Sequence, residues 1–148
     1  MSSSLLVKGR FKSRVSSVLN KNSKEYGKDN MFDGSDESCW NSHQGSPQSC
    51  SVQFLAEDGQ TEQPVNVSSL QICFQGGFVG KDCEIHAITS GSDSFALVSM
   101  FYPEDINTVQ AFPVDIKNAL QVKVLFKSST DFFGRITIYK LDLLGDRS

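Results

Sequence analysis

Alternation of apolar and polar residues with a period of two is the feature that most constrains this fold. Between Leu120 and Phe126 every second side chain is apolar, with Gln121 and Lys123 among the residues between them. Successive side chains of a strand point to opposite faces, so the pattern predicts a strand with one buried face. The stretch 135–144 alternates similarly and is predicted to be a central strand. No segment carries a helical apolar stripe longer than about two turns, so the chain is predicted to be all-β.

Turn-forming residues divide the rest of the chain into further short segments of the same kind. The alternation in residues 65–75 changes phase at Ser68-Ser69, which predicts a β-bulge there. Thr137 is expected to face solvent. The other predicted strands are residues 51–55, 84–89, 95–102 and 109–112, with a Gly-rich loop at 76–83. Many short strands separated by Gly, Pro, Asn and Asp are typical of a β-sandwich or jelly roll, here of about eight strands.

The N-terminal part lacks this alternation. Residues 1–12 are Ser-rich and basic, and we interpret them as a flexible leader that precedes a single domain over 13–148. Val15, Val18 and Leu19 are spaced as in one helical turn, although an irregular segment held by three apolar anchors fits equally well. The polar residues 22–30 are predicted to be a loop.

Charge and cysteine content exclude several classes of protein. The net charge is −3 and basic residues are interspersed with acidic ones, which argues against direct nucleic-acid binding. The apolar run 5–7 is too short for a secretory signal or a membrane span, so we expect the chain in the nucleus or cytoplasm, without membrane attachment. We also expect it to be a monomer. Four cysteines without a CxxC pair are then expected to be free, mostly buried thiols rather than disulfides or zinc ligands.

Catalytic motifs are missing from the sequence. No GxSxG elbow, P-loop or HExxH is present, and neither His43 nor His86 has a recognisable nucleophile beside it. The adjacent carboxylates Glu104 and Asp105 are typical of a solvated turn. The chain is therefore predicted to bind a partner rather than to be an enzyme.

The acidic turn before the single tryptophan allows two interpretations. Asp33-Gly34 favours a tight turn in which the aspartate accepts hydrogen bonds from nearby amides and leads into a buried Trp40. Alternatively Asp33, Asp36 and Glu37 supply hard oxygen ligands of the kind that calcium prefers, with Ser38 as a further candidate ligand. The EF-hand pattern is not matched, and Trp40 itself is either a core residue or a ligand platform.

Aromatic residues in two loops are the candidate partner-binding groups. Adjacent Phe132 and Phe133 would point to opposite sides of a strand, leaving at least one exposed unless both are tucked under the loop. Arg135 follows them, and Phe78 and Val79 lie in the Gly-rich loop. Aromatic and arginine side chains are favoured at interaction hot spots.

Four ordered motifs together resemble a known family. Their order along the chain resembles that of the discoidin, or coagulation factor 5/8 type C, family. The motifs are DG with CWNS (33–42), SLQICFQGGF (69–78), FYPED (101–105) and TDFFGRITIYKLDLLG (130–145). The resemblance implies a galactose-binding-domain-like jelly roll with neighbouring termini. Its nearest branch implies a nuclear protein that binds an orphan nuclear receptor, hinders the receptor's DNA engagement and represses its transactivation.

The sequence departs from the family in ways that bear on function. Carbohydrate-binding members hold a cation in the loop matching 33–40 with a glutamate on the last strand, where this chain has Lys140 and Asp142. Calcium is therefore less expected, although a calcium-assisted site for a glycan or small polar ligand remains the alternative function. No LxxLL helix motif is present, so any receptor contact must use loops or a sheet face.

Overall fold

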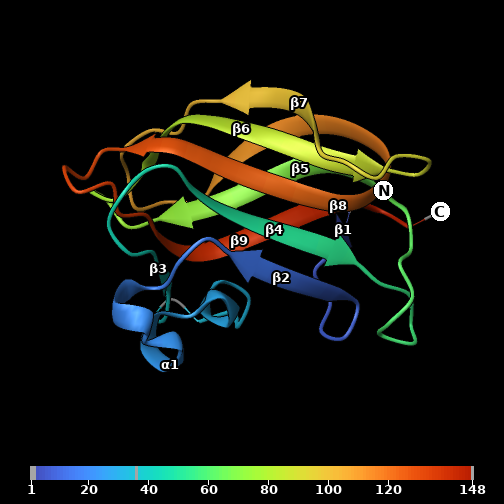
Figure 1. The fold of residues 1–148 in the computed structure, drawn as a ribbon, viewed down its shortest axis with the longest axis horizontal. Helices are drawn as coiled ribbons and strands as arrows, with labels where there is room; N and C mark the ends of the chain where they lie inside the picture. The colour runs from blue at the N-terminus through green and yellow to red at the C-terminus, as the bar shows by residue number, and fades with distance from the viewer. Residues whose placement is uncertain (1–2, 36, 148) are drawn as a thin grey trace.

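The computed structural model describes residues 3–35 and 37–147, which form an antiparallel β-sandwich (Figure 1). Short helical segments η1 (Leu19–Lys21), α1 (Ser23–Tyr26) and η2 (Lys28–Met31) follow the second strand. The strands are β1 (Ser3–Ser4), β2 (Phe11–Val15), β3 (Trp40–Asn41), β4 (Gln48–Phe54), β5 (Val65–Phe74), β6 (Gly80–Thr89), β7 (Ala96–Phe101), β8 (Gln110–Ser129) and β9 (Thr137–Asp146). The predicted all-β jelly roll is confirmed.

The long strand β8 belongs to both layers of the sandwich. Residues 110–119 pair with β5, whereas residues 119–129 pair with β6 on one side and β4 on the other. One layer is therefore β7-β6-β8-β4-β2, and the other joins β8, β5 and β9, with β1 and β3 beside β9 (Figure 1). The sequence predicted two separate strands here because Pro113 and Asn118 interrupt the apolar alternation. Pro113 instead opposes Ser69, where the register of β5 shifts.

The core lies between the two layers and follows the predicted period of two. Val122, Val124 and Phe126 of β8 are buried, and Phe126 packs against Phe74 at 5.8 Å between ring centroids and against Trp40 at 6.3 Å. Trp40 is fully buried, and its indole N–H donates to the Ser17 carbonyl at 2.9 Å. The core interpretation of Trp40 is confirmed. Each such side chain contributes about 1.5–3 kcal/mol through removal from water.

Three local predictions have different outcomes. The register of β5 shifts between Val67 and Ser69, which confirms the bulge. β9 has β5 on one side and β1 and β3 on the other, so it is central as predicted. Thr137 is buried, however, because the β5–β6 loop covers it: its N–H donates to the Phe78 carbonyl and its carbonyl accepts from the Gln75 N–H.

Residues 3–12, predicted to be a leader outside the domain, pack against it. Ser3 and Ser4 pair with the end of β9, and the buried Leu5 donates its N–H to the Leu143 carbonyl at 2.8 Å. Arg147 in turn donates to the Leu5 carbonyl at 2.8 Å, so the two ends of the described chain adjoin (Figure 1). The burial of one leucine and the pairing with β9 outweigh the polar composition of this segment.

The segment 22–30 also differs from the predicted loop. Asn22 caps the single turn of α1 by accepting a hydrogen bond from the Glu25 N–H at 3.2 Å, as N-cap asparagines do. η2 follows and ends at the buried Met31. No helix in residues 3–35 or 37–147 is long and apolar enough to cross a membrane.

The cysteines form no disulfide. Cys50 and Cys83 are buried, and burial raises the pKa of each thiol to about 12. Cys39 and Cys73 are partly exposed. The prediction of buried thiols is therefore confirmed for two of the four cysteines.

Candidate functional site

Three loops meet at one end of the sandwich. The β5–β6 loop (75–79) lies between the end of β8 and the start of β9, where the Thr130 N–H donates to the Val79 carbonyl at 2.9 Å. The loop that follows β3 (42–47) approaches from the other side, and the Gly45 N–H donates to the Phe133 carbonyl at 2.7 Å. These backbone hydrogen bonds hold the β8–β9 loop (130–136) in place.

Arg135 lies against two aromatic rings in this loop group. Its guanidinium carbon is 5.1 Å from the ring centroid of Phe78 and 5.7 Å from that of Phe133. Phe133 in turn contacts Phe132 edge to face at 5.3 Å between centroids. Phe132 is 92% exposed and Phe133 is 53% exposed. We call Phe78, Phe132, Phe133 and Arg135 the aromatic–arginine cluster.

Asp131 fixes the orientation of the arginine. Its carboxylate accepts hydrogen bonds from Arg135 Nε at 3.0 Å, from the Arg135 backbone N–H at 3.1 Å and from Nη2 at 3.4 Å. These hydrogen bonds lower the pKa of Asp131, and the same pairing raises the pKa of Arg135. A planar guanidinium held in this way loses less conformational entropy when a partner covers it.

Gly134 makes the sharp turn between the aromatic pair and the arginine. Its φ is +80°, a left-handed conformation that side chains with a Cβ adopt at a cost. A Cβ at this position would also lie 2.8 Å from the carbonyl carbon of Gly45. Only glycine lets the β8–β9 loop approach the 42–47 loop this closely.

The structure brings together four of the five predicted contact residues. The prediction for Val79 was wrong: this residue is fully buried because its N–H donates to Thr130 Oγ1 at 3.0 Å and its side chain enters the core. Neither Phe132 nor Phe133 reaches the core, since both lie in a turn before β9 rather than on a strand. Asp131 was not predicted as part of the site, although an acid four residues before Arg135 across a glycine turn suggests an ion pair.

The acidic turn before Trp40 fits an Asx turn. One carboxylate oxygen of Asp33 accepts from the Ser35 N–H at 2.9 Å, and the other accepts from the Ser38 hydroxyl. Asp36 lies outside the described residues. Lys140 and Asp142 both line the adjacent hollow of about 180 Å³ beside Gly34. In the described part of the chain, which leaves out Asp36, no three His, Cys, Asp or Glu side chains gather as a metal site would need.

A second exposed apolar region runs along β7. Leu97 is 54% exposed, Met100 58% and Tyr102, just after the strand, 64%. β7 pairs only with β6 among the described strands and is an edge strand. Unlike the aromatic–arginine cluster, this region includes no arginine held against a ring.

Comparisons with known proteins place the chain in a family. No family model matches it. A protein of Danio rerio is 45% identical over 136 residues, covering 91% of both chains, and a human protein is 42% identical over 135 residues with the same coverage. A Xenopus laevis protein is 42% identical over 98% of this chain and 100% of its own length. All three are named nuclear receptor 2C2-associated protein. The chain belongs to the nuclear receptor 2C2-associated protein family.

Solved structures show that this chain has the discoidin fold. The family 32 carbohydrate-binding module of C. perfringens NanJ, in complex with galactose, has a TM-score of 0.73 at 21% identity and covers 97% of this chain and 99% of its own. An F5/8 type C domain from Bacteroides fragilis has a TM-score of 0.80 at 12% identity, covering 98% and 97%. The relatives are named as receptor-associated proteins, and these two structures are named as a carbohydrate-binding module and an F5/8 type C domain.

Proposed function

We propose that this chain is a non-catalytic protein-interaction domain that binds a nuclear receptor, nuclear receptor 2C2, through the aromatic–arginine cluster. Relatives 40–45% identical over about nine-tenths of the chain carry the receptor's name, which supports the choice of partner. The observation that carries the proposal is the almost fully exposed Phe132, which contacts Phe133, together with an arginine that lies over the rings of Phe133 and Phe78. The chain acts as a monomer in the nucleus and also occurs in the cytoplasm.

The cluster has the chemistry of an interaction hot spot. Aromatic rings provide a large contact area with few rotatable bonds, and arginine combines stacking with hydrogen bonding. Phe132 and Phe133 expose apolar surface on a loop held by backbone hydrogen bonds. Burial of that surface against a receptor would release water without first ordering the loop.

Repression follows in this proposal from obstruction of the receptor's DNA contact. DNA-binding surfaces are basic, whereas this chain has a net charge of −3. A negatively charged domain is attracted to such a surface and repels DNA phosphates. The bound chain therefore hinders DNA engagement without itself binding nucleic acid.

The direct test measures affinity for purified nuclear receptor 2C2 by biolayer interferometry. We expect Phe78→Ala with Phe132→Ala to weaken binding at least about 30-fold, because even one hot-spot aromatic contributes on the order of 2 kcal/mol. The matched control is Leu97→Ala with Tyr102→Ala on the β7 edge, which removes exposed apolar surface elsewhere. Unchanged binding in the first variant, or equal weakening in the control, would exclude the cluster as the receptor contact.

The consequence for DNA is tested by a mobility-shift assay with the receptor and its DNA site. Adding the chain is expected to lower the fraction of DNA bound by receptor, and the Phe78/Phe132 double variant should need a much higher concentration. Fluorescence imaging of the tagged chain tests the nuclear location. A slower-migrating complex of chain, receptor and intact DNA would contradict obstruction.

The alternative is a module for a glycan or other small polar ligand, with calcium assisting. The galactose complex of a structural neighbour favours testing this ligand first, although that likeness concerns the fold. A ligand at 100 times its Kd stabilises a protein by about 2.7 kcal/mol, which raises its melting temperature measurably. We expect no shift with galactose, with or without calcium, and a shift abolished by EDTA would favour the alternative.

A further inference from the structure

The free edge of β2 faces an open groove away from the aromatic–arginine cluster. β2 pairs only with β4 among the described strands. The Leu55 N–H donates to the Arg10 carbonyl and the Ser16 N–H donates to the Ser49 carbonyl, which sets the phase of the hydrogen-bonded ladder. Because bonded positions alternate in an antiparallel pair, the backbone groups of residues 11, 13 and 15 point away from β4. The structure's described residues supply no backbone partner for them on that side.

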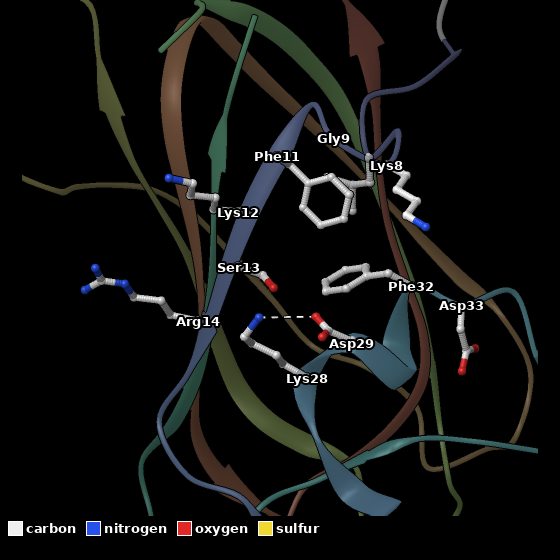
Figure 2. A pocket seen from close by; sticks show the side chains of 11 residues that line it. Lys8, Gly9, Phe11, Lys12, Ser13, Arg14, Lys28, Asp29, Phe32 and Asp33 are labelled. Atoms are coloured by element: carbon white, nitrogen blue, oxygen red, sulfur yellow. Dashed lines mark hydrogen bonds and ion pairs between the residues drawn. The ribbon is translucent and has the colours of Figure 1, made fainter. Parts of the chain in front are cut away.

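The groove separates this edge from η2 and the turn after it. A pocket of about 710 Å³ lies between β2 and Phe32 (Figure 2), and a second of about 370 Å³ continues it as far as Val18. The two pockets share Arg14, Lys28 and Asp29, so together they extend along β2. The first alone has the size of a typical ligand pocket.

Side chains of opposite character lie on the two sides of β2. Phe11 and Phe32 meet edge to face at 5.1 Å between ring centroids and make one wall of the pocket apolar. Figure 2 shows Lys12 and Arg14 projecting from the other side of the strand, away from Phe32. This arrangement follows from the alternation of side chains along a strand.

The lining carries an excess of positive charge. Lys8, Lys12, Arg14 and Lys28 face two acids, Asp29 and Asp33, which leaves a local charge of +2 in a chain of net −3. Asp29 is paired with Lys28 at 3.2 Å, and Asp33 accepts hydrogen bonds within its own turn. Lys12 and Arg14 form no ion pair with any residue that the structure describes.

We propose that this groove binds an extended peptide of a partner protein, in which acidic residues alternate with apolar ones, as an added strand along β2. The backbone of the peptide pairs with residues 11, 13 and 15, as in β-augmentation. Its side chains alternate between the two faces of the enlarged sheet. Apolar side chains therefore reach Phe11 and Phe32, while acidic ones lie beside Lys12 and Arg14.

Three features of the groove favour an alternating acidic peptide over other anions. They are the basic side chains, the aromatic wall and the backbone groups of β2 left unpaired among the described residues. Inorganic phosphate or a nucleic-acid backbone satisfies the lysines but uses neither the aromatic wall nor the strand-edge amides. A purely apolar peptide would leave Lys12 and Arg14 without the carboxylates they attract. An alternating acidic peptide matches all three features.

The test uses fluorescence polarisation with a labelled heptapeptide, Glu-Val-Glu-Phe-Glu-Val-Glu. A peptide of the same composition with four glutamates followed by Val-Phe-Val is the matched ligand control. We expect the alternating peptide to bind at least about tenfold more tightly, because only it places acids on one face of a strand. N-methylation of the amides that face β2 is expected to abolish binding, since it removes backbone donors.

Variants of the chain test the site itself. Lys12→Glu with Arg14→Glu is expected to weaken peptide binding at least about tenfold, because like charges repel across an interface. Lys81→Glu with Lys117→Glu makes the same charge change at exposed positions outside the groove and is expected to have little effect. Phe132→Ala should leave peptide binding unchanged, so this result is independent of the proposed receptor contact. Circular dichroism confirms that each variant is folded.

Four outcomes would overturn the proposal. They are equal binding of the segregated peptide, an equal loss in the Lys81/Lys117 variant, tighter binding of a seven-nucleotide single-stranded DNA, and no binding of the alternating peptide at 1 mM. The first excludes strand addition, the second excludes this groove, and the third identifies a general polyanion site. The last excludes the peptide chemistry altogether.

Discussion

The aromatic–arginine cluster presents side chains to a partner, whereas the groove along β2 (the β2 groove) presents backbone groups. The cluster presents side chains: Phe132 is 92% exposed, while the backbone beneath it is bonded to neighbouring loops. The groove presents a strand edge whose backbone groups at residues 11, 13 and 15 have no ladder partner among the described residues. The first region therefore suits recognition by side-chain packing and the second suits recognition by strand addition.

The two regions also differ in what supports them. The cluster depends on a few local contacts, chiefly Asp131 with Arg135 and Gly134 against Gly45. The groove depends on how β2 and the turn after η2 are placed relative to each other. The contact between the Phe11 and Phe32 rings holds these two segments together. Substitutions at the loop end should accordingly alter one binding activity, whereas damage to the shared core should alter both.

The largest expected effect comes from Trp40, which links β9 to the segment after β2. Trp40 opposes Ile138 of β9 and its indole donates to the Ser17 carbonyl just beyond β2. Trp40→Ala should lower the free energy of unfolding by about 3–5 kcal/mol, as truncation of a buried aromatic does. Urea denaturation followed by circular dichroism measures this, and both binding activities should fall together.

Trp40→Phe is the matched control for that substitution. It keeps an aromatic ring but leaves the Ser17 carbonyl without its donor, so we expect a smaller loss of about 1–3 kcal/mol. A loss below about 1 kcal/mol for Trp40→Ala, or loss of only one binding activity, would show that the two regions do not share this support.

An intermediate effect is expected at Gly134. Gly134→Ala forces a Cβ into a residue with φ of +80° and to within 2.8 Å of the Gly45 carbonyl carbon. We expect a loss of about 1–3 kcal/mol in the free energy of unfolding. Receptor binding should weaken, while binding of the acidic peptide stays the same, because β2 is not part of this turn.

Gly91→Ala separates backbone strain from steric overlap. Gly91 has a φ of +87°, but a Cβ at this position would meet no atom within 4 Å. Its substitution should therefore cost about 1 kcal/mol and alter neither binding activity. Thermal denaturation and the two binding assays check this. Equal receptor binding in Gly134→Ala and Gly91→Ala would mean that the close approach to Gly45 does not position the cluster.

The smallest effect is a pH dependence from Asp131. Hydrogen bonds from Arg135 lower the folded-state pKa of this carboxyl, whereas its pKa in the unfolded chain is about 3.9. Its contribution to stability is therefore present above the unfolded pKa and is lost as the pH falls through the lower folded pKa. Asp131→Asn should remove this contribution, on the order of 0.5 kcal/mol, and flatten the decline of stability in acid.

Asp58→Asn is the control for that measurement. Asp58 also has a lowered pKa, about 2, chiefly because the Thr61 hydroxyl donates to it, but it lies in a different turn. Both substitutions should alter stability in acid, whereas only Asp131→Asn should weaken receptor binding at neutral pH. A similar loss of binding in both would contradict the orienting role of Asp131.

Patterns that depend on a residue's immediate neighbours were predicted well from the sequence. The alternation in β8 and β9 and the bulge in β5 are local, because side-chain direction in a strand changes at each residue. Phe132 and Arg135 lie in the same loop because only two residues separate them in the sequence. The basic residues at 8, 10, 12 and 14 alternate as well, and this pattern could have indicated an exposed strand in the supposed leader.

What depends on distant segments was not predictable in this way. Val79 and Thr137 are buried because the β5–β6 loop packs against the start of β9, and Leu5 is buried because β1 pairs with the end of the chain. The all-β class, the buried face of residues 120–126 and the place of Phe132 and Arg135 in one loop followed from the sequence alone. Only the tertiary structure decided which loops meet around Arg135 and that β2 keeps a free edge, because burial and backbone pairing are properties of contacts between segments far apart in the chain.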